Sequence, residues 1–485
     1  MLPFSFAPHD LVLIAFVSPA LFLYAIHEAN VRHAFFSGWF YGLGVFGVGV
    51  WWLQVSIHQF GIPHWVFSIT LTAAFISFVA LYFAIFAIFA RLIKRENFWY
   101  VFVIPALWML MEYLRSNLFT GFPWLLIGYT QIDGPFKGWM PIVGSLGSTA
   151  FVVFVSAIFV WILRPTNRRL CLALMLLVSL FFSCHILQDI EWTQKEHTDL
   201  DVALVQGSIE QRVKWENDQW LESIQQYLDL SKPYWGTDVI VWPETAVTVI
   251  PDRVPGLVAK LRHLADSEDT SLLIGIPTLD RFSGTYRNSV LKLGDGTELY
   301  SKRKLVPFGE YFPFKERLSW INNLLLVPMS DLSSGMMADD SFVLKGYQAG
   351  ILICYEVAFK EIAFSSLPEA GFLVNVSNDA WFGDTKAPFQ HLQIVKARAL
   401  ESGRSIVRAT NTGITAFIDY RGQVVKRAPQ FSSVVLKHTV SIRSGITPYV
   451  RYGDFPLLFF SVLVISIYGI FVFLSFRKSI HLNDK

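Results

Sequence analysis

The sequence predicts a multi-pass α-helical membrane domain joined to an α/β domain, and three observations lead to this fold class. First, the 485 residues are 53% hydrophobic and only 16% charged, whereas soluble proteins average about 25% charged residues. Second, the apolar excess is confined to residues 1–190 and 456–476, which carry few charges. Third, residues 191–455 have the composition of a soluble domain, in which strand-like and helix-like patterns alternate.

Seven apolar stretches are long enough to cross a membrane, which takes about 20 apolar residues in a helix. One such stretch alone is also typical of a buried core helix, but seven in one chain favour membrane spans. The stretch Pro456–Phe476 follows the soluble part. The six stretches that precede the soluble part lie at residues 10–27, 34–57, 65–90, 98–114, 145–163 and 170–187.

These patterns divide the chain into three segments. We expect residues 1–195 to form an N-terminal transmembrane domain of about six spans. Residues 196–440 form the α/β domain, whose size is normal for one domain. Residues 441–485 form a C-terminal transmembrane helix and a short tail.

Basic residues gather in alternate loops, and by the positive-inside rule these loops are cytoplasmic. The other loops, 58–64 and 116–144, contain a single lysine and no arginine; the lysine is Lys137, and Arg115 stands at the border. The α/β domain and Met1 then lie on the opposite side of the membrane. Met1–Ala7 is too short to be a signal peptide, so we expect a further helix upstream of the present start. The residues of the basic loops are Arg32, Arg91, Lys94, Arg95, Arg164, Arg168, Arg169, Arg477 and Lys478.

Two polar features interrupt the apolar N-terminal part. Glu112 and Arg115 are three residues apart, so they can pair on one face of a helix. Ionisable residues inside a span are candidates for function, but a structural pair at the membrane edge is the interpretation that we favour. Gly121-Phe122-Pro123-Trp124 and Gly134-Pro135 break the helical pattern. They predict a re-entrant or interfacial loop on the same side as the α/β domain.

Alternating patterns predict the elements of the α/β domain. Short β-branched, apolar runs predict strands, and apolar residues at intervals of three and four predict helices. The turns Gly294-Asp295-Gly296 and Tyr420-Arg421-Gly422 predict two hairpins. The predicted strands are Asp201–Val205, Asp238–Trp242, Ser271–Ile276, Tyr286–Leu293, Glu298–Tyr300, Gly350–Glu356, Gly371–Val376, Ile414–Asp419 and Gln423–Lys426, and the predicted helices are Arg212–Leu230, Val254–Ala265 and Phe389–Ser402.

Charge and cysteine content argue against several functions. The formal net charge of +2 lacks the basic excess of a nucleic-acid-binding protein. Cys171, Cys184 and Cys354 lie in apolar runs or in a predicted strand, so they suggest no disulfide framework. The sequence shows no zinc-ligand spacing. We therefore expect neither a nucleic-acid partner nor a metal site.

Three predicted segments of the α/β domain end with a reactive side chain. Trp242-Pro243-Glu244 offers a carboxylate, Lys302 follows the strand that ends at Tyr300, and Gly350–Glu356 carries Cys354. Ligand sites in α/β sheets gather outside the carboxyl ends of strands, so all three side chains could face one cleft. A glutamate base can take the thiol proton, and a lysine can stabilise the oxyanion that forms when the thiolate attacks a carbonyl.

Each of these residues also has a plainer interpretation. A free cysteine such as Cys354 is usually a small buried hydrophobe. Glu244 and Lys302 could be ordinary surface charges. His391, on a later predicted helix, is the histidine that stands nearest to the three motifs, which makes a Cys/His pair the weaker arrangement. The three motifs together favour a Glu–Lys–Cys site.

The three motifs together resemble the nitrilase, or carbon–nitrogen hydrolase, superfamily, whose Glu–Lys–Cys triad matches Glu244, Lys302 and Cys354. A closer resemblance, to the apolipoprotein N-acyltransferase family of bacterial envelopes, covers nearly the whole chain. The motifs VALVQGSI, VWPETA, KLVPFGEYFP, ICYE and SNDAWFGD carry it. It implies a nitrilase-like α-β-β-α sandwich for the α/β domain. The family normally has one more N-terminal helix than this chain.

The resemblance implies an acyl transfer in two steps in the bacterial inner membrane, with the catalytic domain facing the periplasm. The Cys354 thiolate attacks a phospholipid ester, which leaves a thioester and a lysophospholipid. The α-amine of an apolipoprotein's N-terminal diacylglyceryl-cysteine then takes the acyl chain as an amide. Glu244 is the implied general base, and Lys302 supports the oxyanion with the backbone N–H after Cys354. No cofactor is implied, and we expect a monomer.

Four more residues match functional positions of the family: Trp215, Glu310, Tyr355 and Glu356. We expect Glu310 to orient the triad and Trp215 to shape the acyl pocket, although helix packing is the common use of such an aromatic side chain. Leu318–Met329, between the lysine and cysteine motifs, is strongly apolar. It either dips into lipid and admits an acyl chain or is a buried core segment.

Two other functions stay open. A membrane-tethered amidase of the nitrilase type has the same triad but passes the thioester to water. A non-enzymatic scaffold or transporter is the second alternative. Transporters place ionisable groups near the bilayer midplane, whereas here the spans carry few of them and the reactive groups belong to the α/β domain.

Overall fold

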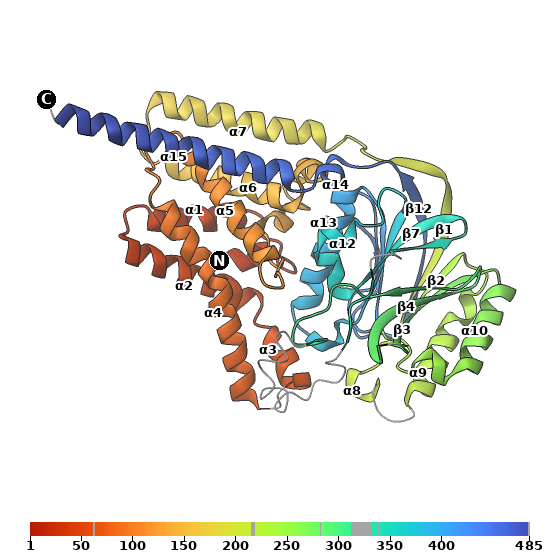
Figure 1. Cartoon of the computed structure of the whole chain (residues 1–485). Coiled ribbons are helices and arrows are strands. Elements are labelled where there is room, and N and C mark those ends of the chain that lie inside the picture. The colour runs from red at the N-terminus through yellow and green to blue at the C-terminus, as the bar shows by residue number, and fades with distance from the viewer. Residues whose placement is uncertain (62–63, 215–218, 282, 312–331, 337–339, 484–485) are drawn as a thin grey trace. The chain divides into compact units, whose positions relative to one another are not determined.

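The computed structural model describes residues 1–61, 64–214, 219–281, 283–311, 332–336 and 340–483. The chain forms two compact units (Figure 1). The first unit consists of Met1–Trp51, Leu71–Ile190 and Arg451–Lys485. The second consists of Trp52–Thr70 and Glu191–Val450.

The first unit is helical, as its apolar stretches predict. Polar residues cap two of its helices, α2 and α7. The side chain of Asn30 accepts the His33 N–H at the start of α2, and Thr166 accepts the Arg169 N–H at the start of α7. The main helices are α1 (Ile14–Ile26), α2 (Val31–Gly49), α4 (Trp65–Ala90), α5 (Tyr100–Asn117), α6 (Met140–Trp161), α7 (Asn167–Leu187) and α15 (Phe455–Asn483).

Length and composition support four or five of the seven predicted spans. Among the described residues, four helices are long and apolar enough to cross a membrane, and the broken pair Val31–Gly49 with Leu53–Gln59 is a fifth candidate. The stretches 10–27 and 98–114 differ from the prediction: α1 has only 13 residues, and α5 is interrupted by an acidic and a basic residue. The four long segments are Trp65–Ala90, Lys137–Trp161, Asn167–Leu187 and Phe455–Ser475.

Glu112 and Arg115 hold the backbone of the irregular loop that follows α5. The Arg115 guanidinium donates to the carbonyl oxygens of Phe122 and Trp124, at 2.8 and 2.6 Å. The Glu112 carboxylate accepts the N–H of Ile127 at 3.3 Å. Irregular backbone inside a helical membrane unit needs such partners, so these contacts support the structural interpretation of the two charges.

The second unit is built on two six-stranded sheets with the orders β12-β1-β2-β3-β4-β5 and β11-β10-β9-β8-β7-β6. In each sheet the three strands β1–β3 or β7–β9 pair in parallel, and the outer strands pair antiparallel. The strands of the first sheet are β1 (Gln194–Gln206), β2 (Val239–Val241), β3 (Ser271–Asp280), β4 (Thr285–Leu293), β5 (Glu298–Ser301) and β12 (Val434–Ser444). Those of the second are β6 (Ser341–Leu344), β7 (Tyr347–Ile353), β8 (Phe372–Ser377), β9 (Ile406–Thr410), β10 (Ala416–Ile418) and β11 (Val424–Arg427).

The two sheets face each other across the main hydrophobic core, and helices cover their outer faces. Leu204 and Val241 of the first sheet share this core with Ile351, Val374 and Val407 of the second. A second core lies between the first sheet and helices α9 (Gln219–Ser231) and α10 (Pro255–Ser267). Helix α13 (Ala387–Ser402) packs on β9 and β10 of the second sheet. The layers are therefore α-β-β-α, as the family resemblance implied.

Shorter helices complete the second unit. The segment Trp52–Thr70 belongs to it because the Trp52 ring packs edge-on against Phe382, with 4.7 Å between ring centroids. The Trp52 indole N–H also donates to Gln390 Oε1 at 3.1 Å. The short helices are α3 (Leu53–Ser56), α8 (Gln211–Lys214), α12 (Lys360–Ala363) and α14 (Pro448–Tyr452).

Two features of the α/β unit differ from the prediction. Strand β7 stops at Ile353, and Cys354–Ala358 is a 3-10 helix, so the cysteine lies just past the strand rather than in it. The described parts of the predicted helix 212–230 are helical, as α8 and α9, and residues 215–218 lie outside the described residues. Strands β6, β9 and β12 were not predicted, because β6 is only four residues long and charged residues interrupt the apolar pattern of the other two.

Candidate active site

Glu244 lies just beyond the carboxyl end of β2, in a turn that packs tightly on β3. A glycine in β3 makes this approach possible, because a Cβ on Gly275 would lie 2.1 Å from the Pro243 carbonyl oxygen and 2.7 Å from the Glu244 Cα. The next residue, Thr245, has a φ of 47°, which non-glycine residues rarely adopt. Backbone strain that packing maintains in this way is typical of functional sites.

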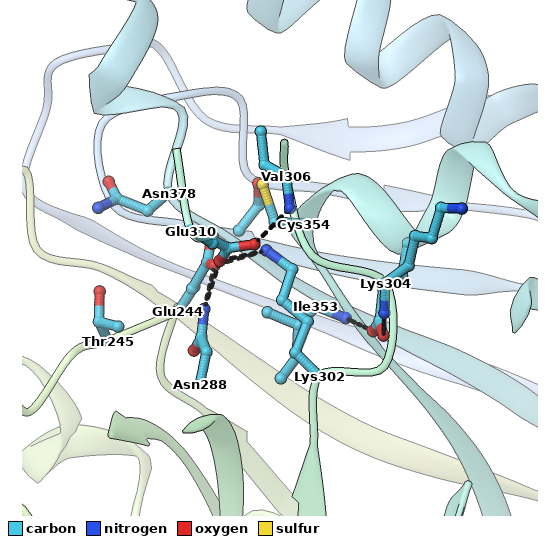
Figure 2. A network of polar contacts seen from close by, with 12 residues as sticks. Glu244, Thr245, Asn288, Lys302, Lys304, Val306, Glu310, Ile353, Cys354 and Asn378 are labelled. Atoms are coloured by element: carbon cyan, nitrogen blue, oxygen red, sulfur yellow. Dashed lines mark hydrogen bonds and ion pairs between the residues drawn. The ribbon is translucent and has the colours of Figure 1, made fainter. Parts of the chain in front are cut away.

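Lys302 follows β5 directly, and its side chain is buried between two carboxylates. Its Nζ lies 2.8 Å from Glu310 Oε1 and 3.4 Å from Glu244 Oε1. The Asn288 amide on β4 donates to the same two oxygens, at 2.7 Å to Glu244 and 3.3 Å to Glu310 (Figure 2). A buried ammonium is stable only with such partners, so the three polar groups fix the lysine in one position.

Cys354 occupies the sharp turn between β7 and the 3-10 helix. Its φ is 52°, in the left-handed region, and the residue as a whole is half-buried. A nucleophile on a strained strand-to-helix turn stands clear of the sheet and can reach a substrate. The charges of Glu244 and Lys302 both act on the Cys354 thiol, and Figure 2 draws the three residues together.

The surroundings of Cys354 determine its protonation. Burial raises the pKa of the thiol well above its usual range and the Glu244 carboxylate raises it further, while Lys302 lowers it. The resting side chain is therefore a thiol, which needs a base at the moment of attack. Burial alone lowers the pKa of Lys302, but Glu310 and Glu244 outweigh this effect and the net shift is upward. The lysine therefore stays charged.

Glu310 ties the lysine to the loop that follows it. Its Oε1 pairs with Lys302, and its Oε2 accepts the backbone N–H of Val306 at 2.8 Å. Phe308, inside this loop, has a φ of 62°. One carboxylate thus fixes both the loop and the ammonium, as a residue that orients the triad would.

Glu356 is fully buried and joins the cysteine segment to the lysine segment. One carboxylate oxygen accepts the N–H groups of Arg303 and Lys304, at 2.6 and 3.1 Å. The other accepts the N–H of Ile353 at 2.7 Å and the hydroxyl of Tyr300 at 2.9 Å. Glu356 therefore sets the spacing between the two reactive side chains and does not point at the thiol.

Of the remaining predicted site residues, the structure describes Tyr355. Tyr355 is half-buried and packs edge-on against Phe359, with 4.9 Å between ring centroids. Trp215 and Leu318–Met329 lie outside the described residues.

Two residues near the site were not predicted to belong to it. Lys214 is fully buried, and its Nζ donates to the carbonyl oxygen of Glu244 at 3.3 Å and to the Thr245 hydroxyl at 3.1 Å. His391, which the sequence made a weak partner for the cysteine, reaches Cys354 through the backbone: Nε2 lies 3.2 Å from the Cys354 carbonyl oxygen. Lysine inside a predicted amphipathic helix carries no signal of burial, so the sequence could not single out Lys214.

One group of side chains has the composition of a metal site. Ligand atoms of Cys354, Asp379 and His391 lie within 4.8 Å of one another. Arg408, however, places Nη2 2.7 Å from Asp379 Oδ2 and 3.0 Å from His391 Nδ1. A metal ion would have to displace this permanent cation, so the donor set does not fit one.

Comparison with known proteins gives matches over both units. Family models match residues 1–158, as the apolipoprotein N-acyltransferase N-terminal domain, and residues 201–445, as carbon-nitrogen hydrolase. The chain is 38% identical to the apolipoprotein N-acyltransferase of Pseudomonas aeruginosa over 464 residues, 94% of this chain and 91% of that protein. It is 37% identical to that of Coxiella burnetii over 481 residues, 98% of each chain. Among solved structures, Nit3 of Saccharomyces cerevisiae, a member of branch 10 of the nitrilase superfamily, aligns with a TM-score of 0.38 at 19% identity, over 52% of this chain and 92% of that one.

Proposed function

The chain belongs to the apolipoprotein N-acyltransferase family, and we propose that it acylates lipoproteins through a thioester on Cys354. The family acts on lipoprotein and phospholipid substrates in a membrane. The observation that carries the proposed mechanism is the convergence of three strand ends on one site. Glu244, Lys302 and Cys354 follow β2, β5 and β7, and the carboxylate and the ammonium both act on the thiol.

The first step is attack of Cys354 on a phospholipid ester. Glu244 takes the thiol proton as the sulfur–carbon bond forms, because the buried thiol is not ionised at rest. Lys302 and the backbone N–H of Tyr355 hold the negative charge of the tetrahedral oxygen. The ester carbon–oxygen bond then breaks, and Glu244 returns the proton to the alkoxide of the departing lysophospholipid. The fatty acyl chain stays on Cys354 as a thioester.

The second step passes the acyl chain to the α-amine of the N-terminal diacylglyceryl-cysteine of an apolipoprotein. The amine nitrogen attacks the thioester carbon, and Glu244 takes the proton that the amine loses. The carbon–sulfur bond breaks, an amide remains on the lipoprotein, and the thiolate of Cys354 recovers the proton from Glu244. Two easier steps thus replace one direct aminolysis of an ester.

The other site residues have supporting roles in this proposal. Glu310 orients Lys302, and Glu356 sets the spacing between the cysteine and lysine segments. Tyr355 supplies the oxyanion N–H from its backbone. We assign the acyl pocket to Trp215 and to Leu318–Met329, whose apolar sequence suits a lipid chain.

We place the enzyme in the bacterial inner membrane as a monomer. Residues 1–195 and 441–485 anchor it, and residues 196–440 carry the chemistry on the periplasmic side, as the basic residues of the alternate loops indicate.

Mass spectrometry of the intact protein, purified from membranes, tests the mechanism. We expect an acyl adduct on Cys354 of the parent protein and none on Cys354→Ser. Serine keeps the size, but its hydroxyl is far harder to ionise than a thiol with a reference pKa of about 8.5. The Cys354→Ser protein should also transfer no acyl chain from phospholipid to a diacylated lipopeptide.

Cys171→Ala and Cys184→Ala are matched controls, because both residues lie in α7 and should leave transfer intact. Full transfer by the Cys354→Ser protein would remove the nucleophile and the mechanism with it. Incubation with phospholipid alone separates the amidase alternative: rapid release of free fatty acid indicates a hydrolase, and a stable thioester indicates a transferase.

A further inference from the structure

His391 contacts the nucleophile through its backbone, and this contact fixes the position of one proton. The Nε2 atom lies 3.2 Å from the carbonyl oxygen of Cys354. A carbonyl oxygen only accepts hydrogen bonds, so Nε2 carries a hydrogen and donates it. His391 is only 1% exposed, so water does not compete for this donor.

The other ring nitrogen is held by a buried ion pair. Arg408 Nη2 lies 3.0 Å from His391 Nδ1 and 2.7 Å from Asp379 Oδ2, and Asp379 Oδ1 lies 3.0 Å from the same Nδ1. When the ring is neutral, Nδ1 accepts from Arg408. When the ring is charged, Nδ1 donates to Asp379. Nε2 keeps its hydrogen toward Cys354 in both states.

The ion pair is itself anchored in the second sheet. Arg408 on β9 is fully buried and bonds the side chain of Asn375 on β8, and Ser377 donates to Asp379 at 3.0 Å. Asp379 can approach closely because the facing residue is a glycine: a Cβ on Gly413 would lie 2.4 Å from Asp379 Oδ2. Polar side chains with this many partners in a dry core hold their neighbours in one arrangement.

The orientation of the Cys354 carbonyl also sets the direction of the following backbone N–H, because a peptide group is planar and trans. Its C=O and the N–H of Tyr355 point in opposite directions, so a donor that fixes the carbonyl also aims that N–H. The strained φ of 52° at Cys354 needs such support, since left-handed backbone is unfavourable for a non-glycine residue. The same peptide sets the direction of the Cys354 side chain.

We propose that His391 is a positioning residue of the acyl transfer. Its Nε2–H fixes the Cys354–Tyr355 peptide, and with it the oxyanion-binding N–H, while the ion pair of Asp379 and Arg408 holds the His391 ring in place. This inference rests on the proposed function, since it assumes acylation of Cys354. It also explains why the nearest histidine is not the base. Burial, and then the charge of Arg408, hold the pKa of His391 below its usual range, although Asp379 opposes them. A neutral ring that already donates from Nε2 has no lone pair there for the thiol proton.

The test compares two replacements of His391 in the full-length protein in detergent. Phe keeps the ring and removes the donor, whereas Gln keeps an N–H donor at a similar distance. The measurement is the single-turnover rate of Cys354 acylation by a phospholipid, followed by mass, together with the KM for that phospholipid. We expect His391→Phe to lower the acylation rate by roughly hundredfold, the effect of losing one oxyanion donor, with KM unchanged. His391→Gln should recover at least tenfold of this loss.

The parent protein is measured first. If the parent forms no acyl adduct, the proposed function is contradicted. If the parent is acylated and His391→Phe is acylated at the same rate, this inference alone is contradicted. Equal inactivity of the Phe and Gln variants, with loss of the parent's pH profile, would assign His391 as the base and overturn the positioning role. His263→Gln, on the exposed face of α10, is the control. If His391→Phe does not insert, Asp379→Asn decides: we expect about a tenfold slower acylation at unchanged KM, and an unchanged rate overturns the proposal.

Discussion

Lys302 pairs more closely with Glu310 than with Glu244, with 2.8 Å between Nζ and Glu310 Oε1 and 3.4 Å between Nζ and Glu244 Oε1. Glu310 also accepts the Val306 N–H through Oε2, so both of its oxygens are occupied by donors. A glutamine at this position can satisfy only one of them, because its amide nitrogen would face the other donor. The pair therefore depends on a full carboxylate.

Glu310→Gln should accordingly leave the fold intact and misplace Lys302. We expect the rate of Cys354 acylation to fall roughly ten- to a hundredfold, which is about 1.4 to 2.7 kcal/mol of transition-state stabilisation. The rate is measured by mass on the intact protein. Glu298→Gln is a matched control, since Glu298 pairs with the equally buried Lys292 elsewhere in the first sheet. An equal loss in both variants would attribute the effect to stability rather than to the site.

Glu244→Gln should remove the base and keep the geometry. The Asn288 amide donates to Glu244 Oε1 at 2.7 Å, and a glutamine oxygen can accept the same hydrogen bond. Loss of general-base catalysis costs roughly 10²- to 10⁴-fold, so we expect acylation of Cys354 to slow by that factor at an unchanged thermal midpoint. Glu222→Gln on the exposed face of α9 serves as the control. Acylation at the parent rate would mean that another group takes the thiol proton.

The sequence was sufficient to predict where the reactive residues lie, because Glu244 and Cys354 follow apolar, β-branched runs and Lys302 follows the second arm of a predicted hairpin. Glu244, Lys302 and Cys354 all lie at strand ends, as predicted. The support around them was not predictable by the same reasoning. Asn288 sits inside a strand whose alternation is ordinary, and its contact with two carboxylates depends on how β4 and β5 pair.

The network beneath Cys354 did leave a signal in the sequence. Arg408 stands inside the buried run Ile406–Thr410, and Asn375 inside Phe372–Ser377. A charge in the middle of a fully buried strand is costly unless it is paired, so such a residue predicts a buried polar partner. The identity of that partner, Asp379, follows only from the fold, because 29 residues separate the two.

Glu356→Gln should damage stability and activity together. Four hydrogen-bond donors converge on the two carboxylate oxygens, and the amide nitrogen of a glutamine would face two of them. Each lost hydrogen bond to a charged group costs about 1.5–3 kcal/mol, so we expect a lower thermal midpoint and slower acylation. Glu361→Gln, in which an exposed carboxylate loses its pair with the half-buried Lys360, should change neither by much, since surface pairs contribute less than about 1 kcal/mol. An unchanged midpoint in Glu356→Gln would contradict its role as the tie between the two segments.

The orientation of the α/β domain can be checked with reporter fusions. Basic residues gather before and at the start of α7 and near the end of α15, and the rule of cytoplasmic positive loops places Lys478 inside and Gly294 outside. Alkaline phosphatase should be active when fused after Gly294 and inactive when fused after Lys478. The opposite pattern would reverse the proposed topology and would put the site in the cytoplasm.

Lys214 gives a prediction that depends on pH. Burial lowers its pKa from 10.5 to about 7 in the folded protein, although Glu244 opposes the shift. Between these two values the unfolded chain holds a proton that the folded protein has released, so the stability of the parent rises with pH in this window. The slope is up to about 1.4 kcal/mol per pH unit. Below pH 7 both states are protonated, and the dependence on this residue disappears.

Lys214→Met and Lys214→Gln carry no titrating group at this position and should lack that slope. We therefore expect the stability of each variant relative to the parent to be greatest near pH 7 and to decline steadily as the pH rises toward 10. Thermal midpoints in one detergent at pH 7, 8, 9 and 10 measure this difference, and other titrating groups cancel because all three proteins share them. The two variants differ in their hydrogen bonds to Glu244 and Thr245, so their absolute midpoints should differ while their slopes agree. A difference from the parent that stays constant over this range would show that Lys214 is charged in the folded protein throughout. The effect of Glu244, which raises the pKa of Lys214, would then outweigh the effect of burial, which lowers it.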